Sequence, residues 1–336
     1  MGWRMPRGLR RATLGSIGLA LLALLMPAAA EAGSLRFRGH GGSPGDEFVF
    51  PDRVKVAAAP PSAANLGVGD FTIEFWMRAS AADNPNPGQS CGFGIDWVNG
   101  NILIDRDRYN QGRKFGIALL GGTVAFGASS DSVDFTLCGA TNVLDLQWHH
   151  VAVERRASDG RMRIWLDGAL DASGPISGGP GGDLSYPADA VPGSYCSPDG
   201  GSGSESCANS DPFLVFGAEK HGFSGINYDG WLDEVRLSTV IRYPSAFTPP
   251  GSPQAADADT AALYRFEEGA GSVAGDDAVG GSDGQVFFGG AAPSGPEWSS
   301  LSPFDAAPSV PALGALARLA LAAALAAVAW AGSSHT

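Results

Sequence analysis

The sequence predicts an all-β domain, because apolar and polar residues alternate along its central segments and nothing there repeats at helical spacing. In the stretch 71–78, FTIEFWMR, every second residue is apolar. A period of two is typical of an antiparallel strand with one buried face. Segments 148–154 and 161–167 alternate in the same way, and Ser158, Asp159 and Gly160 between them form a predicted hairpin turn.

Shorter alternations predict the remaining strands. They lie at 34–39, on both sides of Pro51 within 47–56, and at 95–98, 101–104, 114–120, 123–126, 212–218, 230–243, 262–268, 285–288 and 298–301. VNGN at 98–101 and LGGT at 120–123 are predicted hairpin turns, because Asn-Gly and Gly-Gly supply the positive φ angles that tight primed turns need.

The first 32 residues have the pattern of a secretory signal peptide. Four arginines precede an apolar run at 14–26, and AAAEA at 28–32 ends in a small-residue cleavage pattern. An uncleaved membrane anchor is the alternative, although the run is short for a span of roughly 20 residues. We therefore expect an exported protein, at the cell surface or outer membrane or in the periplasm.

The other end carries a second apolar segment. After a linker at 305–309, residues 310–332 are rich in Ala and Leu and contain one charge, Arg318. This length can span a bilayer, so we expect a transmembrane anchor. It resembles the C-terminal sorting signals of exported bacterial proteins, but the basic end of such signals is missing. A soluble or partner-packed terminal helix is the alternative.

The charge of the chain is acidic, with a formal net charge of −13. An acidic exported protein is not expected to bind nucleic acid or an anionic membrane surface. The oligomeric state has no sequence signal.

Four cysteines follow the signal peptide: Cys91, Cys138, Cys196 and Cys207. An even number of cysteines in an oxidising compartment predicts two disulfides. Cys196 and Cys207 lie within a Gly/Ser-rich insertion at 173–211, which we expect to be a surface loop too polar to pack. A local Cys196–Cys207 bridge would leave Cys91 to pair with Cys138. The opposite pairing stays open at this stage.

The order of these segments resembles a LamG-like domain of the concanavalin A-like lectin/glucanase superfamily. The resemblance rests on SLRFRG, EFVFPD, DFTIEFWMR, WHHVAVERRASDGRMRIWLDG, FGAEKHGFSGINYDGWLDEVRLS and ALYRFEEGAGSVAGDDAVGGSDG, in that order. It implies an antiparallel two-sheet jelly-roll sandwich over 33–304, with the first and last strands as neighbours. The Cys91 loop and the 173–211 insertion depart from the leanest family pattern.

This fold also hosts glycoside hydrolases, which need two carboxylates about 5 to 10 Å apart. No E-x-D-x-E or E-x-D-x-x-E string occurs in the chain, and strand parity sends Asp233 and Glu234 to opposite faces. We therefore expect a non-catalytic protein. A secreted glycan-active enzyme is the alternative.

Oxygen ligands at short spacing in GINYDGWLDEVR predict a calcium site formed by Asn227, Asp229 and Asp233. Parity places Asp233 on the face of Val235 and Leu237, where it needs a partner. The alternative is an aspartate that accepts backbone N–H bonds at a turn. On the other face, Glu74 and Arg236 are expected to form a cross-strand ion pair.

Three tryptophans, Trp76, Trp148 and Trp165, fall on the polar faces of their strands, where indole rings could stack on sugars. The alternative is that they cover the outer sheet beneath a loop. Together these patterns predict a surface-anchored binding or adhesion module for a glycan or an extracellular protein.

Overall fold

The computed structural model describes residues 1–2, 33–39, 52–85, 88, 90–108, 111–187, 193–196, 205–207, 212–220, 227–288 and 295–305, with the strand backbone alone at 193–196 and 205–207. The predicted signal peptide (but for residues 1–2) and the predicted anchor at 310–332 lie outside these residues. Among the helices that are described, none is long and apolar enough to cross a membrane.

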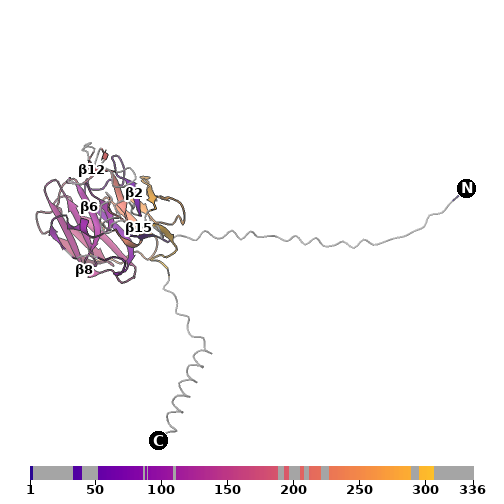
Figure 1. The fold of residues 1–336 in the computed structure, drawn as a ribbon, viewed down its shortest axis with the longest axis horizontal. Helices are drawn as coiled ribbons and strands as arrows, with labels where there is room; N and C mark the ends of the chain where they lie inside the picture. Colours follow the sequence, from indigo (N-terminus) through magenta and orange to yellow (C-terminus); the bar gives the residue numbers. More distant parts are fainter. Residues whose placement is uncertain are drawn as a thin grey trace, which may run out of the picture. The chain divides into compact units, whose positions relative to one another are not determined.

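The described chain is an all-β, two-sheet antiparallel jelly-roll sandwich (Figure 1). The first sheet has the order β11-β10-β9-β3-β15-β1-β19, and β16 also pairs with β15. Its strands are β1 (Ser34–Arg38), β3 (Phe71–Ala79), β9 (His149–Arg155), β10 (Met162–Leu166), β11 (Ala169–Gly174), β15 (Asp229–Ser238), β16 (Thr260–Tyr264) and β19 (Glu297–Ser299). Because β1 pairs with β19, the first and last strands of the described domain are neighbours, as the resemblance implies.

The second sheet has the order β17-β18-β2-β14-β5-β6-β7-β8-β4. Its strands are β2 (Arg53–Ala57), β4 (Gly92–Phe93), β5 (Asn101–Arg106), β6 (Lys114–Leu120), β7 (Thr123–Ser129), β8 (Asp134–Asn142), β14 (Phe213–Phe216), β17 (Val273–Ala274) and β18 (Gly284–Phe287). A separate two-stranded ladder joins β12 (Gly193–Cys196) to β13 (Glu205–Cys207).

The core lies between the two sheets and is formed by the residues that the alternation predicts to point inward. The inward apolar side chains of β3, β9 and β10 are buried: Phe71, Ile73, Phe75, Met77, Val151, Val153, Met162, Ile164 and Leu166. Phe71 contacts the second sheet through Phe115, with ring centroids 5.1 Å apart. Full burial of each such side chain is worth about 1.5 to 3 kcal/mol, so this face holds the sheets together.

A β-bulge in β15 makes one parity prediction wrong. Asp233 lies opposite Trp76 and Arg236 lies opposite Glu74, so two residues of β15 stand against one residue of β3. The extra residue is Glu234, whose φ is 51°. Asp233 therefore shares the outer face of the sheet with Arg236 and not the inner face of Val235.

The predicted strand at 95–98 and the predicted VNGN hairpin are also wrong, because a 3-10 helix at Asp96–Asn99 precedes β5. It buries Trp97 against Gly116 and Gly127, where an added Cβ would lie 1.9 and 1.7 Å from the indole ring. Two facing glycines make the groove that holds this ring. The LGGT hairpin is confirmed: Leu120 pairs with Thr123, and the two glycines between them have φ of 60° and 82°.

Part of the 173–211 insertion packs, contrary to expectation. Leu184 and Tyr186 are buried. The buried Arg155 guanidinium donates to the carbonyl oxygens of Pro180 and Gly182, at 2.7 and 2.6 Å. Arg155 thus holds this part of the insertion by hydrogen bonds to its backbone carbonyl oxygens. The sequence did not predict this packing because the insertion contains few apolar residues.

Candidate functional site

The outer face of the first sheet, which is turned away from the core, is covered by residues 239–259 between β15 and β16, here called the strap. The Thr72 hydroxyl donates to the Val240 carbonyl at 2.6 Å, and the Phe247 N–H donates to the Gly168 carbonyl at 2.9 Å. The Phe247 ring lies 6.0 Å from the ring of Trp165. The strap therefore contacts β3, β10 and the turn that follows β10.

Glu74 is fully buried beneath the strap. Its Oε1 accepts from Arg236 Nε at 2.7 Å, and its Oε2 accepts from the Tyr243 hydroxyl. His150 Nε2 lies 3.3 Å from Oε2. Burial alone would raise the pKa of Glu74, but His150 and Arg236 outweigh it and hold this pKa below its ordinary value. The predicted Glu74–Arg236 ion pair is confirmed.

Glu154 is the second buried carboxylate of this face. Its Oε2 accepts from Trp165 Nε1 at 2.9 Å and its Oε1 accepts from the Tyr243 N–H at 2.8 Å. Burial raises the pKa of Glu154 in spite of these donors. Because Thr72 is paired with Glu154 in the ladder, Glu74 and Glu154 are diagonal neighbours on adjacent strands. A search for carboxylates along a single strand misses such a pair.

Environments that shift two carboxylate pKa values in opposite directions are typical of acid/base pairs. Here, however, each of the four oxygens of Glu74 and Glu154 accepts a hydrogen bond from the protein, and the strap covers both groups. Tyr243 donates to both of them. This arrangement holds the strap on the sheet.

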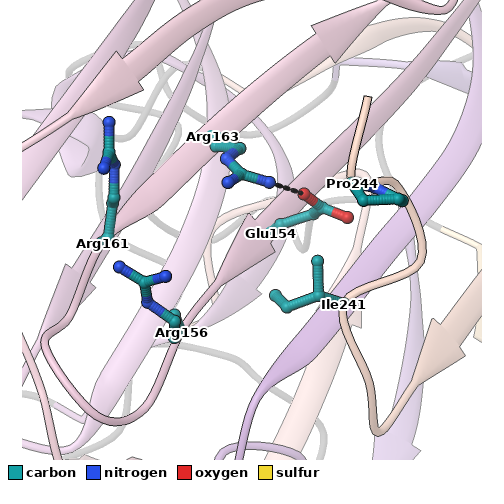
Figure 2. A pocket seen from close by; sticks show the side chains of 6 residues that line it. All are labelled: Glu154, Arg156, Arg161, Arg163, Ile241 and Pro244. Carbon is teal, nitrogen blue, oxygen red and sulfur yellow. Dashed lines mark ion pairs between the residues drawn. The ribbon is translucent and has the colours of Figure 1, made fainter. Parts of the chain in front are cut away.

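Beside the strap lies an open pocket of about 280 Å³, here called the arginine pocket. It is lined by Glu154, Arg156, Arg161, Arg163, Ile241 and Pro244. Figure 2 shows Arg163 pointing toward Glu154, with Arg156 and Arg161 on the opposite wall. Arg161 and Arg163 flank the inward-pointing Met162, so strand alternation directs both to the outer face.

The three guanidinium groups of the arginine pocket differ in their partners. Arg163 Nη1 lies 3.5 Å from Glu154 Oε2. Arg156 Nε donates to Asp159 at 2.8 Å within the turn. Arg161 is exposed and forms no ion pair with any residue in the described part of the chain. Of the three guanidinium groups in the pocket, only that of Arg161 lacks an ion pair within the described residues, and its charge still acts on Asp159.

The predicted stacking tryptophans occupy three different environments. Trp165 is 3% exposed beneath the strap. Trp76 is half-buried and meets His150 and Phe304 edge to face, at 5.2 and 6.0 Å between ring centroids. Trp148 is half-buried just before β9. None of the three lines the arginine pocket.

Each of the three predicted calcium ligands has its own partner in the protein. Asn227 Oδ1 accepts from the Glu219 N–H at 2.9 Å, Asp229 is paired with Arg36, and Asp233 Oδ1 accepts from the Glu234 N–H at 2.8 Å. Within the described residues, no cluster of three or more His, Cys, Asp or Glu side chains is placed to hold a metal ion. All three side chains thus have partners in the protein, and a calcium site at these residues stays a proposal.

The disulfide Cys91–Cys138 is present, with its Cα atoms 5.9 Å apart, and it ties the segment before β4 to β8. The ladder of β12 and β13 pairs Gly193 with Cys207 and Cys196 with Glu205. The side chains of these two strands lie outside what is described, so the Cys196–Cys207 bridge stays a prediction.

Part of this chain matches a known protein family. Residues 54–194 match the Laminin_G_3 family, described as the concanavalin A-like lectin/glucanases superfamily. Over these residues the match agrees with the resemblance drawn from the sequence, and the matched segment includes Glu154 and the three arginines of the pocket. Comparison with curated protein sequences gave no match.

Similar folds occur among solved structures. A candidate carbohydrate binding protein from Bacteroides ovatus is 13% identical, with a TM-score of 0.43 over 75% of this chain and 58% of that protein. A SAP-like pentraxin from Limulus polyphemus is also 13% identical, with a TM-score of 0.35 over 65% of this chain and 79% of the pentraxin. The LG4-5 domains of the mouse laminin alpha1 chain are 14% identical, with a TM-score of 0.35 over 65% of this chain and 44% of that structure.

Proposed function

We infer that the domain is a non-catalytic binding module that holds a carbohydrate or an extracellular protein at the arginine pocket. The observation that carries this proposal is the exposed Arg161, which has no ion pair in the described residues and stands beside Arg156 and Arg163. Two apolar side chains, Ile241 and Pro244, complete the lining of the pocket. The buried carboxylates Glu74 and Glu154 support a binding role, because their oxygens already accept hydrogen bonds from the strap and the sheet.

A glycan array and a panel of extracellular matrix proteins, both probed with the full chain, test this function. Bound candidates are then measured against an Ile241→Ala variant, which changes the apolar wall of the pocket and removes no charge. A ligand whose affinity is the same for both chains does not bind at the pocket and would refute the proposed site.

The alternative function is a glycan-cleaving enzyme, which the opposite pKa shifts of Glu74 and Glu154 favour. Assays of reducing-sugar release on every glycan that binds distinguish the two functions. Release that disappears in a Glu154→Gln variant would replace the binding proposal with a catalytic one.

We also propose export and surface anchoring, on the basis of the signal pattern at 1–32 and the apolar segment at 310–332. Fractionation of cells that express the full chain, or a chain ending at Asp305, tests both. The full chain should sediment with membranes and the shorter chain should appear in the soluble exported fraction. Equal release of both chains would show that the tail anchors nothing.

A further inference from the structure

We propose that the arginine pocket binds an acidic sugar, that is, a saccharide ring that carries a carboxylate or sulfate group. This inference rests on the proposed function and names its ligand class. Its basis is the charge, the apolar lining and the size of the pocket.

The charge of the pocket is opposite to that of the protein. The chain has 22 Lys and Arg against 35 Asp and Glu, yet three arginines and one glutamate line this pocket. Asp159, the carboxylate of the adjacent turn, is held by Arg156. The Arg161 side chain forms no ion pair within the described residues, although its charge acts on the nearby Asp159, so its N–H groups can bind a ligand oxyanion. A guanidinium group binds planar or tetrahedral oxyanions with two parallel N–H bonds.

The lining of the pocket adds an apolar surface to this charge. Ile241 and Pro244 come from the strap and stand across the pocket from Arg161 (Figure 2). A sugar ring presents C–H groups on its face and polar groups at its rim. An anionic substituent at the rim could therefore reach Arg161 while the ring face packs on the two strap residues.

The size of the pocket favours a sugar over an acidic protein surface. A volume of about 280 Å³ is at the lower end of small-ligand pockets and suits one ring-sized group. A specific protein partner normally covers about 800 Å² on each side, around an apolar or aromatic centre. The arginine pocket is small, cationic and bounded by the β9–β10 turn and the strap.

Calorimetry with the full chain and matched probes tests the inference. The probes are oligogalacturonate, its methyl ester of the same length, dextran sulfate, dextran and poly-glutamate. We expect binding of oligogalacturonate or dextran sulfate, with at least tenfold weaker affinity for the neutral counterpart. Arg161→Ala should weaken acid binding about tenfold or more, and Arg161→Lys should weaken it less. The control is Arg265→Ala, which removes the same charge from a residue that pairs with Asp277 and does not line the pocket.

The outcomes separate this inference from the proposed function. Equal loss of affinity in Arg161→Ala and Arg265→Ala would overturn the inference. The acidic probe would then be attracted by the overall charge of the protein and not by the pocket. Poly-glutamate that binds as tightly as the acidic sugars, with the same dependence on Arg161, would overturn the choice of a sugar. If a neutral glycan binds with an affinity that depends on Ile241 and no acidic probe binds, the acidic ligand class is refuted. The proposed function at the pocket is then still supported. If no ligand of any class depends on Ile241 or Arg161, both proposals fail.

Discussion

The ring of Tyr243 stacks on the ring of Phe247, with centroids 3.5 Å apart and planes 9° apart. Both residues belong to the strap, and Phe247 in turn contacts His150 and Trp165 edge to face. The stack therefore fixes Tyr243 where it can donate to the two buried glutamates. Ile241 and Pro244, which line the arginine pocket, lie within two residues of Tyr243 in the strap.

The Tyr243 hydroxyl should stabilise the domain through its bond to the Glu74 carboxylate. Tyr243→Phe keeps the ring stack and removes only the hydroxyl. Hydrogen bonds to charged groups are worth about 1.5 to 3 kcal/mol, so we expect a loss of that size in the free energy of unfolding, measured by urea denaturation. Tyr243→Ala should lose more, because the stack also disappears. Equal stability of Tyr243→Phe and the unchanged chain would show that the hydrogen bond from Tyr243 to Glu74 does not stabilise the domain.

The strands of the sandwich could be predicted because one buried face imposes a period of two on residues such as Ile73 and Val153. The same alternation predicts that Arg161 and Arg163 point outward. It could not predict the bulge at Glu234, because one extra residue in β15 leaves the local composition unchanged. The remaining wall of the pocket comes from Ile241 and Pro244, in a segment without periodicity whose course depends on contacts distant in the sequence.

Gly127 should be intolerant of any side chain, because its added Cβ would lie 1.7 Å from Trp97. We expect Gly127→Ala to lower the free energy of unfolding by about 1 to 3 kcal/mol through overpacking. Gly69→Ala is the matched control, since an added Cβ there has no heavy atom within 4 Å. The double variant Gly127→Ala with Trp97→Ala should lose less than the sum of the two single losses. Additive losses would contradict a direct clash.

The Cys91–Cys138 disulfide should stabilise the domain by constraining the unfolded chain. It closes a loop with a sequence separation of 47, for which chain entropy gives about 4 kcal/mol. We expect the double variant Cys91→Ser with Cys138→Ser to lose stability on this scale in urea denaturation. A loss below about 1 kcal/mol would contradict this prediction.

The local Cys196–Cys207 bridge should appear in peptide mapping under non-reducing conditions. Its basis is the ladder of β12 and β13, which brings the two segments side by side. A single peptide pair containing Cys196 and Cys207 is the expected result. A fragment that joins either of them to Cys91 would contradict it.

Asp233 and Glu234 should make the domain less stable as the pH rises. Burial and the charge of Glu234 raise the pKa of Asp233 to about 9, and burial raises the pKa of Glu234 to about 7. Both values exceed those of an unfolded chain, near 4, so the folded state binds more protons between about pH 4 and pH 9. Stability from these groups is therefore complete below about pH 4 and is lost as the pH rises through the folded pKa values.

Melting temperatures at pH 5, 7 and 9 in the presence of a chelator test this dependence, with Asp233→Asn as the informative variant. The variant keeps the shape of the side chain but cannot ionise, so we expect it to melt higher than the unchanged chain at pH 9 and no higher at pH 5. A repeat with added Ca²⁺ tests the calcium proposal at Asp233, because a bound cation would stabilise the ionised carboxylate. A melting temperature that rises with Ca²⁺ in the unchanged chain but not in Asp233→Asn would support a cation at this residue. If Ca²⁺ has no effect, Asp233 is a buried acid that folding keeps protonated. If the unchanged chain melts higher at pH 9 than at pH 5 in the presence of chelator, the predicted loss of stability with rising pH is wrong, whether or not Asp233 binds a cation.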